Sequence, residues 1–444
     1  MKIAFIKPNM FPEPSSDALQ PLAFAVLAGL TSLKHEVRLY DERVEVLPET
    51  IDADIAAISV ETFTARRAYQ LASRLRRQGL HIVMGGYHSS FLPEESLLFC
   101  DTVLVGEAED VWPLFLQDVE AGCAKKIYRS NEAPELKNIL YERSIFKGKQ
   151  YASIYPVQFG RGCRFACDFC SIHAFYPGEP RQRSVNEVIA EIESLGKKYI
   201  FIVDDNIAAY KEQAIEFFKA LMPLKIRWIS QASMDVTGDD EILDLMAESG
   251  CMALVIGFES LRTENLRRMN KSVNISENSP EAAIARLRQR GIMVYGTFIF
   301  GYDFDTSDMF EKTLNFAVQN KLALANFNPL MPTPGTRLYT RLEEEGRLLY
   351  RKWWLDNGFS YGDAMFRPRM MTPEELSQGC FDVRRKFNRF STIIRRALDR
   401  KANAANLSNL AMFSMANFMS RKEIYRKQGA CLGEDRTSLQ KAIL

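Results

Sequence analysis

The sequence predicts an α/β protein with three parts: an N-terminal doubly wound parallel sheet, a partial (β/α)6 barrel and a mostly helical C-terminal region. Two series of short apolar strands, each alternating with helical segments, predict the first two parts. A change to long stretches of helical spacing after residue 340 predicts the third. We place these parts at residues 1–125, 151–340 and 341–444, with a polar linker at residues 126–150.

Length and composition limit the class of protein. The chain has 444 residues, of which 47% are apolar and 25% charged, as in a soluble globular protein of two or three domains. No apolar run approaches the ~20 residues that span a bilayer. Met1 and Lys2 lead directly into a strand rather than into a signal peptide. We therefore expect a cytoplasmic protein, and the net charge of +1 gives no reason to expect a nucleic-acid partner.

The first 125 residues alternate strand and helix. Helical spacing covers residues 21–33 and 65–79, and Gly79 ends the second of these helices. The expected strands are residues 3–8, 36–41, 55–60, 81–86 and 102–107. Parallel sheets of this kind bind ligands beyond the carboxyl ends of their strands. We therefore expect the segments KPN, SVETFT, GGYHSS and GEAED to line a binding edge.

A second strand–helix series begins at residue 155. Its expected strands are residues 155–160, 199–205, 226–233, 253–260, 292–301 and 324–330, with helices between them, for example at 185–198 and 240–250. Short connections between successive parallel strands predict a full or partial barrel. Polar residues end several of these strands, and the carboxyl rim of a barrel is where such folds place their chemistry.

Three of the eight cysteines form one cluster with the spacing C-x3-C-x2-C. Cys163, Cys167 and Cys170 follow the first barrel strand and Gly162, which allows a tight turn. One interpretation is a structural zinc site with His173 as fourth ligand. The other is a [4Fe–4S] cluster held by three thiolates, with one iron left open for a substrate. The remaining five cysteines are scattered, so we expect them to be small buried apolar residues.

The motif C-x3-C-x-F-C after the first strand of a six-unit barrel resembles the radical S-adenosylmethionine (SAM) enzymes, over roughly residues 155–335. The resemblance implies that the open iron binds the amino and carboxylate groups of SAM. An electron from the cluster then cleaves SAM into methionine and a 5′-deoxyadenosyl radical, which removes hydrogen from an inert carbon. The protein binds and orients the cofactors and excludes water from them.

Further residues match the same family. Phe169 corresponds to the aromatic position beside the adenine of SAM, and GFES resembles the fourth-strand segment that contacts SAM. FIVDDN resembles the second-strand motif near the methionyl ammonium, and a ribose contact is expected at the tip of the third strand. The resemblance thus gives as candidate SAM contacts Phe169, Asp204, Asp205, Gln231, Ser233 and Glu259.

A doubly wound domain before such a barrel resembles the cobalamin-binding branch of the family, and the resemblance then covers nearly the whole chain. The first loop, KPNMFPEPSSD, departs from the usual pattern because it lacks the histidine that ligates cobalt. Either cobalt has no protein side-chain ligand here, or the domain binds no corrinoid. The later segments SVETFT, GGYHSS and VGEAE remain, and they give as candidate cobalamin contacts Ser59, Thr62, Gly85, Gly86, His88 and Glu107.

With both cofactors, the resemblance implies methylation of an unactivated carbon in a lipid, a tetrapyrrole-like molecule or another natural product. One SAM would methylate cobalt, and a second would give the radical. Ring formation or oxidation without methyl transfer is an alternative. A non-catalytic iron–sulfur corrinoid redox protein is an alternative of another class. The resemblance also implies an electron donor such as flavodoxin or ferredoxin.

The C-terminal end is basic and rich in Met and Phe. From residue 380 onward, Lys and Arg clearly outnumber Asp and Glu. Amphipathic helices of this composition can rest on an anionic membrane surface. The alternative is that they only cap the barrel and turn their charges to solvent. Peripheral contact with the inner membrane face is therefore one of two expectations for this region.

Overall fold

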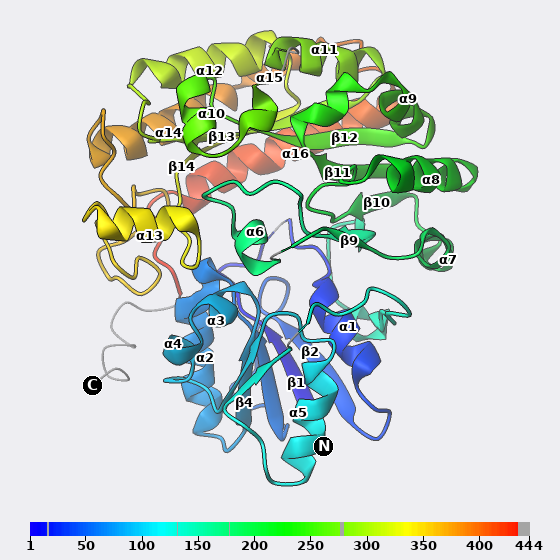
Figure 1. Ribbon diagram of the computed structural model, residues 1–444, viewed down its shortest axis with the longest axis vertical. Coiled ribbons are helices and arrows are strands. Elements are labelled where there is room, and N and C mark those ends of the chain that lie inside the picture. Colours follow the sequence, from blue (N-terminus) through cyan, green and yellow to red (C-terminus); the bar gives the residue numbers. More distant parts are fainter. Residues whose placement is uncertain (16, 131, 177, 276–278, 434–444) are drawn as a thin grey trace.

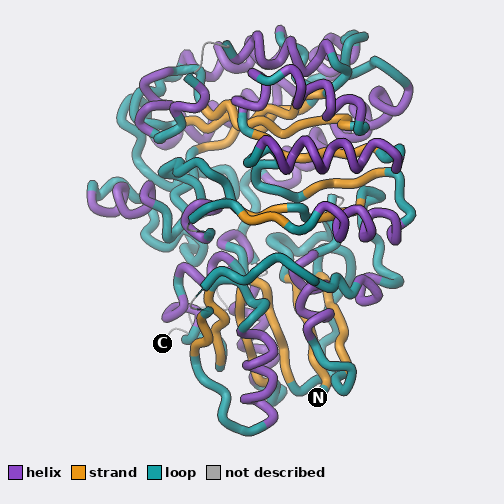
Figure 2. Tube along the Cα trace, turned by 45° about the vertical axis from the view of Figure 1, so that its right-hand side comes forward, coloured by secondary structure: helices purple, strands orange, loops and turns teal. Residues whose placement is uncertain are grey.

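The computed structural model describes residues 1–444 except 16, 131, 177, 276–278 and 434–444. Two parallel sheets, each flanked by helices, dominate it (Figures 1 and 2). The predicted α/β class, the doubly wound N-terminal sheet, the partial barrel and the helical C-terminal region are confirmed. None of the described helices combines the length and apolarity needed to cross a bilayer.

The first sheet has six parallel strands in the order β2-β1-β3-β4-β5-β6. Its strands are β1 (Lys2–Lys7), β2 (Glu36–Asp41), β3 (Ile55–Ser59), β4 (His81–Gly85), β5 (Thr102–Val105) and β6 (Ile127–Arg129). Its helices are α1 (Leu22–Leu30), α2 (Ala65–Arg76), α3 (Tyr87–Phe91), α4 (Pro93–Ser96) and α5 (Val111–Glu120). The central strands are apolar on both faces, as expected of a parallel sheet covered on two sides.

Each face of this sheet has its own core. Phe24 of α1 and Trp112 of α5 pack on one face, against Phe5 of β1. Tyr69 of α2 belongs to the core on the other face. Helices on both faces define the doubly wound arrangement.

The predicted linker at residues 126–150 contains a strand. Within it, β6 pairs in parallel with β5 and extends the first sheet by one edge strand. Tyr128 of β6 is buried, and its ring packs edge-on against Phe115. Three residues are too few to show a period in the sequence, which is why β6 was not predicted. The boundaries at residues 125 and 150 stay a prediction.

The second sheet also has six parallel strands, in the order β14-β13-β12-β11-β10-β7, so β7 and β14 form its two edges. The strands are β7 (Tyr155–Val157), β10 (Tyr199–Ile202), β11 (Arg227–Ala232), β12 (Cys251–Glu259), β13 (Met293–Phe300) and β14 (Leu324–Pro329). The strand order follows the chain order, with a helical crossover between neighbours, which makes this sheet a partial barrel.

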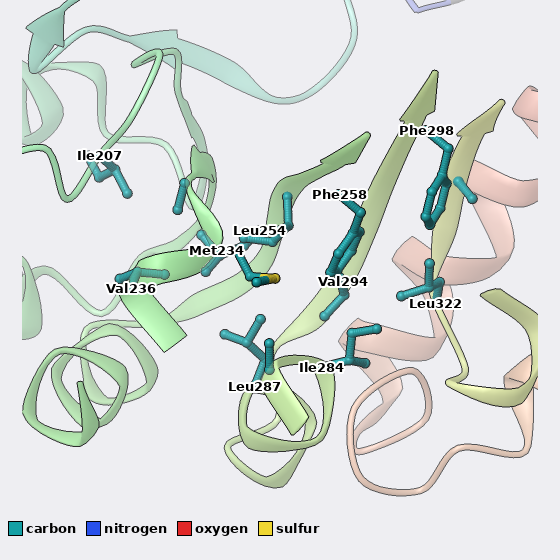
Figure 3. Packing of buried hydrophobic residues seen from close by; sticks show 14 of the residues in the cluster. Ile207, Met234, Val236, Leu254, Phe258, Ile284, Leu287, Val294, Phe298 and Leu322 are labelled. Atoms are coloured by element: carbon teal, nitrogen blue, oxygen red, sulfur yellow. The ribbon is translucent and has the colours of Figure 1, made fainter. Parts of the chain in front are cut away.

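Helices connect and follow the strands of the partial barrel. They are α7 (Val185–Leu195), α8 (Lys211–Leu221), α9 (Asp240–Glu248), α10 (Thr263–Arg268), α11 (Pro280–Gln289), α12 (Asp308–Gln319) and α13 (Arg337–Glu344). Figure 3 shows Leu254 and Val294 of neighbouring strands meeting Ile284 and Leu287 of α11. Alternate strand positions, such as Gly257, are only partly buried because they face the concave side.

The C-terminal region packs on both domains. Helices α14 (Pro373–Phe387), α15 (Phe390–Ala397) and α16 (Leu407–Lys427) lie against the second sheet and its helices. The segment before α14 instead reaches the first domain. Trp353, Trp354 and Phe359 are buried in the same core as Tyr69 of α2. This segment therefore ties the two domains together.

Candidate functional site

The cysteine cluster lies at one end of the partial barrel, in a loop between two short elements. Cys163 and Cys167 follow β8 (Gly160–Arg161), which pairs with β9 (Arg181–Gln182), and Cys170 directly precedes α6 (Ser171–Phe175). Gly162 has a φ of +89°, a conformation that favours glycine, so the predicted tight turn is confirmed. Burial raises the pKa of all three thiols, that of Cys167 to about 12. Burial therefore favours the neutral thiols, and a bound cation would favour the thiolates.

The carboxylates that follow β10 hold the backbone leading into this loop. Asp204 Oδ1 accepts a hydrogen bond from Phe159 N at 2.8 Å, and Asp205 Oδ2 accepts one from Gly162 N at 2.8 Å. Burial raises the pKa of Asp204 to about 7. We predicted these carboxylates as acceptors for the SAM ammonium. One oxygen of each carboxylate accepts from a backbone N–H group, which indicates a positioning role, and their contact to SAM stays a prediction.

A second set of bonds fixes the loop from the opposite side. Asp168 N donates to Met269 O at 3.0 Å, and Asp168 O accepts from Leu338 N of α13 at 2.9 Å. Its side chain accepts a 2.5 Å hydrogen bond from the Tyr302 hydroxyl and pairs with Arg341 Nη2 at 3.2 Å. Hydrogen bonds thus connect the cysteine loop to residues from both the early and the late part of the barrel sequence.

Glu259, at the end of β12, is held in a strained conformation. Its φ is +62°, which is costly for a residue with a side chain, and the register between β12 and β13 shifts at this point. Its Oε1 lies 2.8 Å from Lys271 Nζ. A Cβ on Gly257 would lie 2.2 Å from Glu259 Oε1 and 2.8 Å from Lys271 Nζ. Only glycine leaves room for this ion pair.

Lys271 is a functional candidate that the sequence did not reveal. Its side chain is 12% exposed. Burial disfavours its ammonium, but the Glu259 carboxylate outweighs this effect and raises the pKa of Lys271. The charge of Lys271 also opposes the effect of burial on the pKa of Cys167. A buried cation and carboxylate side by side near the thiols match the carboxylate and ammonium of an amino-acid ligand.

The remaining barrel candidates lie at the expected strand ends. Gln231 Nε2 donates to Asp204 O at 3.4 Å, and Ser233 N donates to Asn206 Oδ1 at 3.4 Å. Phe169 is half-buried and packs against the barrel core. All three are partly exposed, and their contacts to SAM stay predictions.

A cavity of about 390 Å³ runs along the carboxyl edge of the first sheet. Its inner part is apolar and lies between the sheet and helices α1 and α5, with Leu27 and Trp112 among its lining residues. Its outer part carries charged groups and is completed by the barrel domain, through Tyr176 near the cysteine loop and Val203 after β10. One cavity therefore borders both the first sheet and the segment that carries the cysteines.

Four of the six N-terminal candidates line this cavity: Ser59, Gly85, Gly86 and Glu107. The backbone conformation at position 86 also requires a glycine. Gly86 has a φ of +98°, and a Cβ there would lie 2.8 Å from Val60 O. Thr62 is buried within the domain and is absent from the cavity lining.

His88 is a core residue and not a cavity residue. It is fully buried, and its Nε2 lies 3.1 Å from the Tyr69 hydroxyl and 3.2 Å from Glu95 Oε1. Trp354 Nε1 donates to the same Glu95 oxygen at 2.8 Å. The prediction of a cofactor contact is corrected, because His88 belongs to a polar network that anchors the C-terminal segment. The sequence placed His88 in the right loop but could not show on which side of it the ring lies.

Glu107 joins the two domains. Its two carboxylate oxygens bind Arg161 Nη1 at 2.6 Å and Arg181 Nη2 at 2.5 Å, and both arginines belong to the β8–β9 hairpin. Arg161 Nη1 also pairs with Glu109 at 2.6 Å. Glu107 therefore holds the hairpin that bears the cysteine loop against the wall of the cavity.

Comparison with known proteins agrees with this geometry. Residues 157–317 match the Radical SAM superfamily. The chain is 30% identical over 405 residues to bacteriochlorophyllide d C-12(1)-methyltransferase of Chlorobaculum tepidum, covering 88% of each chain. The chain belongs to the B12-binding-domain branch of the radical SAM superfamily.

Two further comparisons extend over most of this radical SAM protein. Bacteriochlorophyllide d C-8(2)-methyltransferase of Chlorobaculum tepidum is 28% identical over 353 residues, covering 75% of this chain and 78% of the relative. The structure of the cobalamin-dependent radical enzyme OxsB with aqua-cobalamin and SAM bound has a TM-score of 0.64 at 16% identity, covering 96% of this chain and 72% of OxsB. The fold is thus shared along nearly the whole length.

The cysteine loop of this radical SAM enzyme fits a [4Fe–4S] cluster. A cluster of this kind takes one thiolate per iron, so its ligands need not converge on one point. Among the described residues, no group of three or more His, Cys, Asp or Glu side chains is placed to hold a single metal ion. The assignment of Cys163, Cys167 and Cys170 as the three cluster ligands stays a prediction.

Proposed function

We propose that this enzyme transfers a methyl group to an unactivated carbon of an apolar, tetrapyrrole-like substrate, with a [4Fe–4S] cluster, SAM and cobalamin as cofactors. One observation carries the proposal: a single cavity borders both the binding edge of the first sheet and the segment that bears the cysteines. The relation to two bacteriochlorophyllide methyltransferases supports it. A reduced flavodoxin or ferredoxin is the proposed electron donor.

The cavity has the features that a corrinoid needs. The inner apolar part between the sheet and α1 and α5 suits the nucleotide tail, and its wall residue Ala57 leaves room beside Val83 and Leu104. The edge at Ser59 and Gly86 allows a planar ring to approach the backbone. We propose that cobalamin is held here without a histidine ligand, since His88 is occupied elsewhere.

The residues around the cluster prepare the radical step. When bound, the cluster and SAM supply a carbon-centred radical, and cobalamin supplies a transferable methyl group. Lys271 and Glu259 are the proposed partners of the SAM carboxylate and ammonium, which their opposite charges support. Asp204 and Asp205 keep the cysteine loop in place.

Aromatic side chains at the domain boundary favour a flat, apolar substrate. Tyr87 and Phe175 have ring centroids 4.3 Å apart, and both line the cavity with Tyr176. Burial strongly raises the pKa of Tyr87, so its hydroxyl stays neutral at physiological pH. A surface of neutral rings suits a macrocycle better than a charged metabolite.

Labelled SAM tests the proposal. The reconstituted, reduced enzyme is incubated anaerobically with cobalamin, methyl-labelled SAM and bacteriochlorophyllide d. We expect a labelled tetrapyrrole together with 5′-deoxyadenosine and S-adenosylhomocysteine. Cys167→Ala should abolish all three products, whereas Cys123→Ala, at an exposed cysteine outside the loop, should form them normally. Formation of 5′-deoxyadenosine without S-adenosylhomocysteine would contradict methyl transfer and support ring formation or oxidation.

A further inference from the structure

Helices α15 and α16 present large apolar side chains to solvent. On α15, Phe390, Ile394 and Leu398 follow one another at four-residue spacing and are 55%, 60% and 73% exposed. This spacing places them in one stripe along the helix. We define the α15–α16 face as Phe390, Ile394, Leu398, Leu407, Leu410, Met415, Phe418 and Tyr425, which are all exposed.

The stripe on α16 joins the stripe on α15. Leu407, Met415 and Phe418 are 86%, 54% and 54% exposed and lie on one side of this 21-residue helix. The ring centroids of Phe390 and Phe418 are 6.3 Å apart, and the two helices contact each other. In Figure 1 both helices lie behind the second sheet. The exposed apolar residues thus form one continuous surface and not scattered points.

The inner side of the same helices includes buried polar side chains. Asn417 of α16 is fully buried, and its Nδ2 donates to Ala323 O at 3.1 Å. Arg396 of α15 is also fully buried and donates to Leu322 O at 3.0 Å and Ala323 O at 2.8 Å. These bonds determine which side of each helix faces the second sheet.

Ile393 of α15 and Phe413 of α16 also pack inward, in a small apolar cluster with Met252 and Met293 of the second sheet. The helices therefore carry apolar residues on their outer side as well as on their inner side.

The exposed charged residues within 385–430 are all basic. Two acidic side chains lie beside this stretch, where Asp382 pairs with Arg385 at 2.9 Å and Glu311 of α12 pairs with Lys386 at 3.0 Å.

The two carboxylates between residues 385 and 430, Asp399 and Glu423, are buried and paired with Arg288 and Arg426 at 2.8 and 2.6 Å. The exposed basic residues of this stretch are Arg385, Arg389, Arg395, Arg400, Lys401 and Lys422. The face is therefore an apolar strip inside a rim of cations.

We propose that the α15–α16 face binds an anionic lipid surface, with its apolar side chains in the acyl boundary and its cations at the phosphates. An apolar strip with a basic rim matches both layers of such a surface. A second copy of this chain fits poorly, because a twofold contact would bring the two basic rims together. The inference does not depend on the proposed reaction, since it uses none of the cofactor-binding residues.

Vesicle flotation of the purified full-length protein tests this inference. The protein is mixed with vesicles of phosphatidylcholine alone or of phosphatidylcholine with phosphatidylglycerol. We expect it to float only with the anionic vesicles and to be released by high salt. The triple variant Ile394→Ser, Leu398→Ser, Phe418→Ser should lose binding at least tenfold, and because the three side chains are exposed it should fold normally.

Charge variants test whether the basic residues around the α15–α16 face, rather than the net charge of the whole protein, cause binding to the vesicles. Neutralising each basic residue near the surface weakens vesicle binding roughly fivefold, so the triple variant Arg389→Gln, Arg400→Gln, Lys422→Gln should bind about 100-fold more weakly. The matched control neutralises three exposed basic residues far from this face in the sequence, Arg77 of the first domain and Lys126 and Lys147 of the linker, and should bind as the native protein does.

Three results would overturn the inference. The first is absence of flotation with anionic vesicles. The second is equal loss of binding in the control variant, which would show that net charge and not this face is responsible. The third is a concentration-dependent dimer in analytical ultracentrifugation that the Ile394, Leu398, Phe418 variant converts to monomer while vesicle binding is unchanged. That result would assign the face to a second copy.

Discussion

At the scale of single residues, the ion pair between Lys271 and Glu259 is the most informative feature of the site. Both side chains are about nine-tenths buried, and Glu259 has a left-handed backbone conformation. Backbone strain of this kind persists only where the surroundings enforce it, and it gathers at binding sites. Removing one partner leaves an uncompensated buried charge, which costs more than the pair contributes.

Lys271→Gln should weaken SAM binding by roughly tenfold or more, because it removes the cation proposed to bind the SAM carboxylate. The measurement is equilibrium binding of SAM to the reconstituted protein, with iron content determined on the same sample. Lys312→Gln is the matched control, since Lys312 is an exposed lysine that pairs with Asp308 on α12. Unchanged SAM affinity in Lys271→Gln at full iron content would contradict the assigned role.

At this scale, the sequence shows which residues carry the chemistry more readily than it shows which side chains they contact. Cysteine spacing indicated a candidate metal or cluster loop, because three thiols in eight residues are rare outside metal sites. Lys271 carries no such local signal. It reaches Glu259 only because the chain returns after α10, so its proximity is a product of tertiary structure. The sequence named the Asp204 and Asp205 carboxylates but not their backbone donors, Phe159 N and Gly162 N, because spacing does not show which donors they meet.

At the scale of elements, the contact between α4 and the segment before α14 anchors the C-terminal region. Burial opposes the ionisation of Glu95, but hydrogen bonds from His88, Lys352 and Trp354 outweigh it, and the pKa of Glu95 falls to about 2. A lowered carboxyl pKa means that the folded state prefers the charged form. The resulting stability is present above the unfolded pKa, near 4.5, and is lost as pH falls toward 2.

Glu95→Gln should lower the stability of the protein at pH 7 by about 3 kcal/mol, which is the free energy of a pKa shift of this size. Urea unfolding followed by tryptophan fluorescence measures it. The native protein should lose stability between pH 5 and pH 3, whereas the variant should change little there. Glu94→Gln is the control, because Glu94 is exposed. If the pH profiles of Glu95→Gln and the native protein run parallel, the assignment is wrong.

Most elements were predictable because their apolar spacing is strong. All eleven expected strands are present, including buried β3 and β12, whose apolar runs are bounded by turn residues. The short strands β6, β8 and β9 were missed because two or three residues carry no period. Pairing alone defines them. The tryptophans at 353 and 354 were likewise not assigned to the first domain, since only the folded chain brings them to α2.

At the scale of the whole molecule, the arrangement of the two domains determines the function. The cavity has walls from both, and Glu107 of the first domain binds Arg161 and Arg181 of the second. The sequence predicts the two domains but not this contact, because the contact joins residues more than fifty positions apart. We therefore propose that these ion pairs couple cobalamin binding to the position of the cysteine loop.

Glu107→Gln should weaken cobalamin binding at least tenfold, because two largely buried arginines lose a carboxylate partner and the cavity wall loosens. Absorbance titration with cobalamin measures the affinity, and amide hydrogen exchange reports loosening at the β8–β9 hairpin. Glu132→Gln, at an exposed position, serves as the control. Native affinity together with native exchange in Glu107→Gln would refute this coupling.

The central claim is that a corrinoid and a radical-generating cluster occupy neighbouring parts of one protein. Pulsed electron paramagnetic resonance on the holoenzyme, with cobalamin in its Co(II) state and the cluster reduced, tests this claim most directly. We predict a dipolar coupling between the two spins that disappears in Cys167→Ala. A sample that retains both cofactors and shows no coupling, or a protein that binds no cobalamin at all, would contradict the account.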